Sequence, residues 1–164
     1  MQRRIAVIFV SRRGSLRSIL AQGCLAHLDP KNYAAHACGQ PGQIDRAIHP
    51  AAVAALQTAG MALPKDAPHS WNDLVRSGAP AADFVITLEP DTQPFQPRWP
   101  GQPDAALWAF PDIAAGADPQ AVAPAAMQML FALRRRLELL VSLPMRGADR
   151  AAVRSDLRDL AHLG

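Results

Sequence analysis

Two short runs of apolar residues stand out along the chain, and a polar turn follows the first of them. Residues 5–10 are continuously apolar and rich in β-branched side chains, and residues 83–88 contain a second run of this kind. Such runs are typical of strands that are buried on both faces, as in a parallel sheet. Residues 32–38 and 105–110 show weaker strand patterns. The pattern therefore predicts a parallel sheet built from these segments.

Helical spacing of apolar residues alternates with the strand patterns. The expected helices occupy residues 18–28, 50–59, 71–76 and 118–141. Strands that alternate with helices predict a single α/β domain with a doubly wound parallel sheet. Residues 89–104 contain five prolines, so we expect a long loop without regular structure there. A loop of this length in a compact domain is usually functional or mobile.

The C-terminal segment differs in character from the rest of the chain. Val153, Leu157, Leu160 and Leu163 recur at helical spacing among Arg and Asp residues. We therefore divide the chain into a domain of residues 1–143 and a helical extension of residues 144–164. The apolar stripe of the extension must be covered by something. Packing on the same chain and dimer formation both satisfy this need, and we hypothesise a homodimer contact.

Composition narrows the classes of function. The 164 residues carry a net charge of +3, which permits an anionic ligand but does not argue for nucleic acid. Residues 5–10 are too short for a signal sequence or a membrane span, so we expect a cytoplasmic protein without membrane contact. Two cysteines do not make a disulfide scaffold. The histidines lack metal-ligand spacing and nucleotide-binding glycine motifs are missing, so we expect neither metal nor cofactor.

The turn after the first strand is the strongest candidate for a ligand site. Open parallel sheets bind ligands at the carboxyl ends of their strands, and the N–H groups of such a turn can hold an oxyanion. Arg17 can add a two-pronged contact to phosphate or a similar anion, and Gly14 permits an unusual backbone conformation. The residues expected to bind the anion are Ser11, Arg12, Arg13, Gly14, Ser15, Leu16, Arg17 and Ser18. The alternative is a solvated loop that binds nothing.

A serine, five further residues, an arginine and a serine follow the first predicted strand, at Ser11, Arg17 and Ser18. Together with four later segments, this frame resembles the family of low-molecular-weight protein tyrosine phosphatases and thioredoxin-coupled arsenate reductases. The hallmark of this family is Cys-x5-Arg-Ser/Thr after the first strand, and Ser11, Arg17 and Ser18 reproduce its frame. The other four segments are residues 47–60, 84–88, 108–112 and 133–137, which are similar to the family's "HPxxxxAL…G" helix, "VITLC" strand, "W.FPDP" segment and closing helix. The resemblance covers roughly residues 4–143.

The resemblance implies a three-layer fold of the phosphotyrosine phosphatase I type, with flavodoxin-like winding and a four-stranded parallel sheet. It also implies roles for individual residues. Ser11 takes the place of the cysteine that attacks phosphorus or arsenic, and Arg17 that of the arginine that binds the oxyanion. Asp112 takes the place of the acid that protonates the leaving group, and Ser18 that of the hydroxyl that supports the thiolate.

Departures from the family pattern put catalysis in doubt. An alkoxide is far more basic than a thiolate, so Ser11 would need a general base, for which His49 and Asp112 are the candidates. Gly14 replaces an asparagine that braces the loop, and Ile113 follows Asp112 where proline is usual. Glu89 stands where "VITLC" has a cysteine, so the disulfide relay of the reductases is missing.

Several other residues have both a functional and a structural interpretation. Cys24 lies on the apolar face of its helix and is expected in the core. Cys38 is expected at a strand end, and redox chemistry is its alternative role. His49 before Pro50 is expected to start a helix. Trp99 and Trp108 can form an aromatic wall beside the site, although we favour core packing. Arg12 and Arg13 either widen the positive potential or face solvent, and Arg134, Arg135 and Arg136 are expected on a solvated helix face.

Three functions fit these observations. The first is a catalytically impaired relative, a pseudoenzyme that binds phosphate, arsenate or a phosphate ester in the loop of residues 11–18. The second is an active hydrolase of phosphate esters that uses Ser11 or an activated water, with Asp112 as the acid. The third is a protein-interaction module whose loop binds no ligand.

Overall fold

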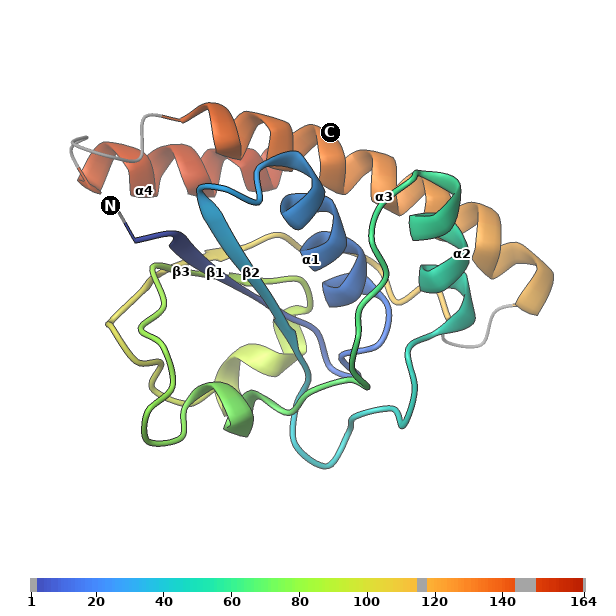
Figure 1. Cartoon of the computed structure of the whole chain (residues 1–164), viewed down its shortest axis with the longest axis horizontal. Helices are drawn as coiled ribbons and strands as arrows, with labels where there is room; N and C mark the ends of the chain where they lie inside the picture. Colours follow the sequence, from blue (N-terminus) through green and yellow to red (C-terminus); the bar gives the residue numbers. More distant parts are fainter. Residues whose placement is uncertain (1–2, 115–117, 144–149, 164) are drawn as a thin grey trace.

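The computed structural model describes residues 3–114, 118–143 and 150–163, and its centre is one parallel sheet (Figure 1). The strands are β1 (Ile5–Val10), β2 (Tyr33–Cys38), β3 (Phe84–Thr87) and β4 (Asp104–Leu107). They are ordered β2-β1-β3-β4, so the chain moves from β1 first to one side and then to the other. This arrangement confirms the α/β fold with a four-stranded, doubly wound parallel sheet.

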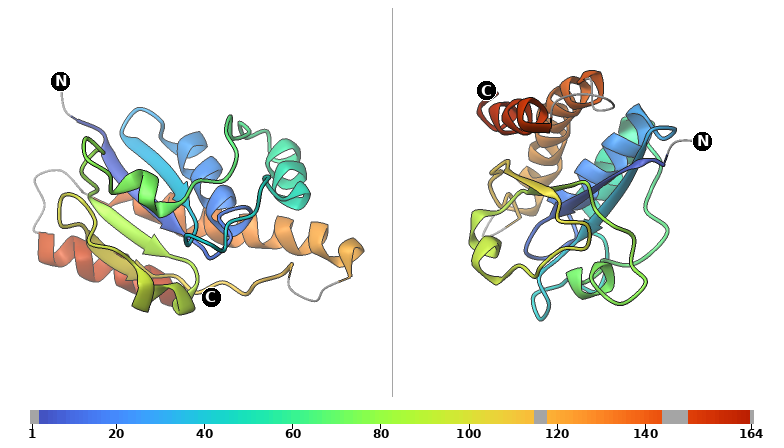
Figure 2. Two further views of the ribbon diagram at one scale, coloured as in Figure 1. Left: turned by 90° about the horizontal axis from the view of Figure 1, so that it is seen from below. Right: turned by 90° about the vertical axis from the view of Figure 1, so that its left-hand side faces the viewer.

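Helices cover mainly one face of the sheet. The α-helices are α1 (Arg17–Leu28), α2 (Pro50–Thr58), α3 (Pro119–Ser142) and α4 (Arg150–Asp159), and the short 3₁₀ helices are η1 (Trp71–Leu74), η2 (Pro90–Phe95) and η3 (Leu160–His162). α1, α2 and α3 pack together on one side of the sheet, whereas η1 and irregular segments cover the other (Figures 1 and 2). The third layer is therefore thin.

Alternating side chains of β1 supply two separate cores. Val7 and Phe9 are buried against the α-helices, and Ile8 and Val10 are buried against Trp71 of η1. Successive side chains of a strand point to opposite faces, so a continuous apolar run is the sequence of a strand covered on both sides. The burial of β1 confirms this interpretation of the sequence.

The proline-rich stretch of residues 89–104 contains regular structure, which the sequence analysis did not expect. Residues 90–95 form η2, so that expectation is wrong for these residues. Pro90 occupies the first turn, where a backbone N–H would have no partner inside the helix. The Thr92 hydroxyl donates to the Glu89 carbonyl at 2.8 Å, which stabilises the turn. A single short 3₁₀ helix therefore tolerates the prolines.

The C-terminal helix packs on the chain's own core. Val153 and Leu157 of α4 are buried, and the Trp108 indole N–H donates to the Leu157 carbonyl at 3.1 Å. Arg154 pairs with Asp104 of β4 at 2.7 Å. The same chain thus covers two residues of the stripe that motivated the homodimer hypothesis, whereas Leu160 and Leu163 are only partly buried, so the homodimer contact stays a prediction. Residues 144–149 of the predicted extension lie outside the described residues. No described helix is both long and apolar enough to cross a membrane.

Candidate functional site

The carboxyl edge of the sheet brings together loops from three strands. Val10 of β1 pairs with Thr87 of β3, and Thr87 pairs in turn with Leu107 of β4. The chain segments that follow these three residues therefore begin side by side. They carry the loop of residues 11–18, Glu89, and the segment from Phe110 to Asp112. This edge is also the place where the winding changes direction, the usual ligand site of such sheets.

The loop of residues 11–18 is held from outside through its carbonyl groups. The carbonyls of Arg12, Arg13 and Ser15 accept hydrogen bonds from backbone N–H groups at residues 40, 45 and 49, at 2.9, 3.1 and 3.0 Å. Gly14 has a φ of +67°, and a Cβ on it would lie 3.0 Å from the Gly39 nitrogen. Glycine is therefore required at this position, both for the left-handed backbone and for the close approach.

The inner donors of the loop lack protein acceptors. Within the described part of the chain, the N–H groups of residues 13–16 donate no hydrogen bond to another residue. Gly14, Ser15 and Leu16 are buried, and Leu16 precedes the first turn of α1 without capping it by a side chain. Buried N–H groups at a helix N-terminus are the donors that bind oxyanions in proteins.

Arg17 opens α1 and is buried at the carboxyl edge, with 5% of its surface exposed. One guanidinium nitrogen, Nη1, donates to the Phe110 carbonyl at 3.0 Å, and the other, Nη2, donates to Oε1 of Glu89 at 2.6 Å. Nη2 also lies 3.9 Å from Oδ2 of Asp112. The guanidinium is thus fixed by loops that follow β3 and β4.

Glu89 is one of the residues at this site that sequence reasoning missed. It is 6% exposed, and its Oε1 accepts from the Arg12 backbone N–H at 2.8 Å as well as from Arg17. Its Oε2 lies 3.1 Å from Nη2 of Arg12, which also pairs with Asp91 at 3.0 Å. In the family pattern, Glu89 stands out only as the residue that replaces a cysteine. The available signal was an acidic residue directly after a buried strand.

Ser11 lies under the loop without a general base. It is 2% exposed, and its hydroxyl donates to the Ser18 hydroxyl at 2.8 Å. His49 uses its Nδ1 to accept from the Ala51 N–H at 3.0 Å, which caps α2 as expected. Among the described residues neither His49 nor Asp112 forms a hydrogen bond with Ser11. A serine without a base stays protonated and is a poor nucleophile.

The predicted catalytic residues share one small cavity. Its lining consists of Ser11, Arg13, Ser15, Leu16, Arg17, Asp45, His49, Asp112 and Ala114. Asp45, which sequence reasoning also missed, accepts from the Ser15 hydroxyl at 2.6 Å. The cavity measures about 20 Å³, which suits a water molecule. The structure thus brings Ser11, Arg17 and Asp112 together, while Arg12, Gly14 and Ser18 lie outside the lining.

The cysteines and two of the tryptophans lie away from the cavity. Burial raises the pKa of the Cys24 thiol to about 12 and raises the pKa of Cys38 as well, so both thiols stay protonated at neutral pH. Trp108 is fully buried among the helices, and Trp99 packs edge-on against Trp71 at 6.4 Å between ring centres. The favoured core interpretation fits both tryptophans better than an aromatic wall.

The expectation of a solvated arginine face on α3 is wrong for Arg136, which lies against aromatic rings. Its guanidinium lies 4.5 Å from the centre of the Phe110 ring and 5.9 Å from that of Trp108, and it donates to the Leu163 carbonyl at 3.1 Å. Burial lowers its pKa. Arg134 behaves as expected, because it forms an exposed pair with Glu138 at 2.7 Å. Helix periodicity places Arg136 on the buried side, where aromatic rings receive its charge.

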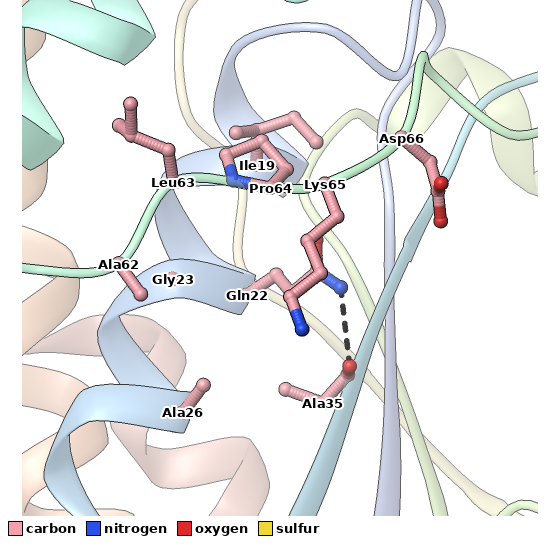
Figure 3. Close-up of a pocket in the computed structure, with 10 residues that line it drawn as sticks. All are labelled: Ile19, Gln22, Gly23, Ala26, Ala35, Ala62, Leu63, Pro64, Lys65 and Asp66. Atoms are coloured by element: carbon pink, nitrogen blue, oxygen red, sulfur yellow. Dashed lines mark hydrogen bonds between the residues drawn. The ribbon is translucent and has the colours of Figure 1, made fainter.

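A wider cavity between α1, β2 and the segment of residues 62–66 differs chemically from the loop site (Figure 3). Its lining is mostly apolar, and its charged side chains are Lys65 and Asp66. Gln22 donates to the Ala35 carbonyl at 3.2 Å across one wall. Because this lining is mostly apolar and contains no residue of the loop, we place the candidate site at the loop of residues 11–18.

The structure of this chain is similar to solved structures of other proteins. No family model and no curated protein matches the sequence. A thioredoxin-dependent arsenate reductase from Corynebacterium glutamicum superposes with a TM-score of 0.57 at 22% identity, covering 83% of this chain and 63% of that one. The tyrosine phosphatase Wzb from Escherichia coli K30, in complex with sulphate, gives a TM-score of 0.64 at 16% identity, covering 84% and 99%.

An arsenate reductase in its oxidized state gives a TM-score of 0.66 at 22% identity, covering 84% of this chain and 96% of that one. Identities this low establish the fold alone. The fold is therefore that of arsenate reductases and low-molecular-weight tyrosine phosphatases, as the resemblance implied.

Proposed function

We propose that this chain binds a tetrahedral oxyanion, such as phosphate, arsenate or a phosphate ester, in the loop of residues 11–18 without catalysing its transfer. The observation that carries the proposal is the row of N–H groups at residues 13–16 without protein acceptors, next to the buried guanidinium of Arg17. The solved structure of the tyrosine phosphatase Wzb in complex with sulphate supports it, since that protein shares the fold.

The lack of catalysis follows from the surroundings of Ser11. Its hydroxyl is directed to Ser18, and both described thiols are buried and protonated. Asp112 is retained near Arg17, which is the observation that favoured an active hydrolase. An acid for the leaving group does not supply the missing nucleophile, however, so binding is the function that we propose.

Phosphate, sulfate or arsenate should stabilise the native protein, and Arg17→Ala should remove the effect. A ligand at about a hundred times its Kd raises the free energy of unfolding by about 2.7 kcal/mol, which a thermal melt detects. Arg98→Ala is the matched control, because Arg98 is an exposed arginine outside the cavity lining. An undiminished shift in Arg17→Ala would place the site elsewhere, and no shift in the native protein would favour an interaction module.

Native protein should hydrolyse an aryl phosphate no faster than buffer, and Ser11→Ala should leave this background unchanged. The missing general base alone would contribute about 10²–10⁴-fold. Ser11→Cys should gain phosphate release, because a thiol supplies the nucleophile that the loop lacks. Release by the native protein that disappears in Ser11→Ala would contradict the binding-only proposal.

A further inference from the structure

The Glu89 carboxylate accepts hydrogen bonds from donors of the loop that would also bind an external anion. Its Oε1 receives the Arg12 N–H at 2.8 Å and the Arg17 guanidinium at 2.6 Å. These two donors come from opposite ends of the loop, and both converge on one carboxylate oxygen. A backbone amide and an arginine that share an oxygen form the same pair of contacts that an oxyanion accepts at such a loop.

The charge of Arg17 is balanced inside the protein. Its Nη2 has the Glu89 carboxylate at 2.6 Å and the Asp112 carboxylate at 3.9 Å. Arg12 is balanced by Glu89 at 3.1 Å and by Asp91 at 3.0 Å. An entering dianion would therefore meet the buried carboxylate of Glu89 and the partly exposed carboxylate of Asp112 beside the cation that should attract it. Like charges so close to one another repel strongly where water is scarce.

The free space at the site is small. The cavity beside Ser11, Arg17 and Asp112 measures about 20 Å³. The donors of residues 13–16 are in place, so the loop itself is formed. For an anion to accept from the Arg12 N–H and the Arg17 guanidinium, Glu89 has to release these two donors.

We propose that Glu89 is an internal ligand of the loop, a carboxylate that competes with external oxyanions and sets the affinity of the site. This inference rests on the proposed function. An oxyanion enters when Glu89 releases Arg17 and the Arg12 amide, and the ligand then takes over both donors. Glu89 thus supplies an acceptor to two of the loop's donors in the absence of ligand, and this lowers the affinity of the site for an anion.

Glu89→Gln tests the inference, because the amide keeps the shape and an acceptor oxygen but removes the charge. Inorganic phosphate binding should become about tenfold tighter or more, measured by calorimetry. Asp91→Asn is the matched control: it removes a neighbouring carboxylate that is 79% exposed and touches Arg12 alone, so its affinity should change by less than about threefold. Adding Arg17→Ala to Glu89→Gln should abolish the gain.

The outcomes separate this inference from the proposed function. If the native protein and Glu89→Gln bind phosphate equally well and Arg17→Ala does not bind it, Glu89 is not an internal ligand. The proposed function would then still stand. A gain in Asp91→Asn as large as in Glu89→Gln would also overturn the internal ligand. Absence of phosphate binding in all variants would overturn both. Binding by Glu89→Gln but not by the native protein supports the internal ligand.

A second variant covers the case in which Glu89→Gln does not fold. Glu89→Asp keeps the charge but shortens the side chain, so the carboxylate can no longer reach both donors. Phosphate should then raise its melting temperature by more than it raises that of the native protein, because the anion fills the vacated acceptor position. An equal or smaller shift would count against the inference.

Discussion

Trp108→Ala is expected to lower the free energy of unfolding by about 3–5 kcal/mol, as for other fully buried aromatic residues. Trp108 is 0% exposed, its N–H holds the Leu157 carbonyl of α4, and Arg136 lies over its ring. Its loss would leave a cavity between β4, α3 and α4 and an unpaired carbonyl. Denaturant unfolding followed by circular dichroism measures the change.

Trp99→Ala is the matched control for this prediction. Trp99 is only partly buried and packs on Trp71 in the core on the opposite face of the sheet. Trp99→Ala should lower the free energy of unfolding by about 1–2 kcal/mol, close to the average for single substitutions. Phosphate affinity should fall in Trp108→Ala but not in Trp99→Ala, because Trp108 positions the segment that carries Phe110 and Asp112. A smaller loss of stability in Trp108→Ala than in Trp99→Ala would contradict the packing described here.

Local signals in the sequence predicted the sheet and the loop. The apolar run of residues 5–10 is buried on both faces, and α1 begins at Arg17, one residue before the predicted start. Gly14 was expected to permit an unusual backbone, and its φ of +67° confirms this. Each of these predictions depends on residues that are neighbours in the sequence, so periodicity and turn chemistry suffice to make them.

The contacts of Glu89 and Arg136 could not be predicted from the sequence, because they form between segments that are distant along the chain. Glu89 meets Arg17 only because β1 and β3 are neighbours in the sheet, and 72 positions separate the two residues. Arg136 looked like part of a solvated basic run, but the turn of α3 brings it over Phe110. Helix periodicity indicates the side of α3 on which Arg136 lies, but no local pattern shows which distant groups a charged side chain will contact.

Arg136 and Arg17 connect the core to the candidate site through Phe110. Phe110 receives Arg136 on its ring, and its carbonyl accepts from Arg17 at 3.0 Å. Packing on α3 thereby fixes the segment that also carries Asp112. The same edge of the sheet presents Glu89 from β3, so the loop after β1 is surrounded by groups whose positions the sheet determines. A change in anion affinity can therefore arise from the core as well as from the loop.

Glu89→Ala is expected to lower the free energy of unfolding by about 3–5 kcal/mol, the usual cost of leaving a buried charge without its partner. Arg17 and Glu89 are 5% and 6% exposed, so water cannot replace the lost carboxylate. The Arg12 N–H loses its acceptor in the same variant. Glu89→Gln should lower the free energy of unfolding by less than Glu89→Ala does, because the amide oxygen of glutamine still accepts a hydrogen bond.

The double variant Arg17→Met with Glu89→Leu decides whether the loss comes from the charge pair. Because it removes both charges, it should be more stable than Glu89→Ala by about 1–3 kcal/mol, although the Arg12 amide stays unsatisfied. Asp91→Ala, which removes an exposed carboxylate, should change stability by less than about 1 kcal/mol. Chemical denaturation of the four proteins gives the comparison. If Glu89→Ala were no less stable than Asp91→Ala, the carboxylate would not be a ligand of Arg17 in solution, and the loop would be free to take an external anion.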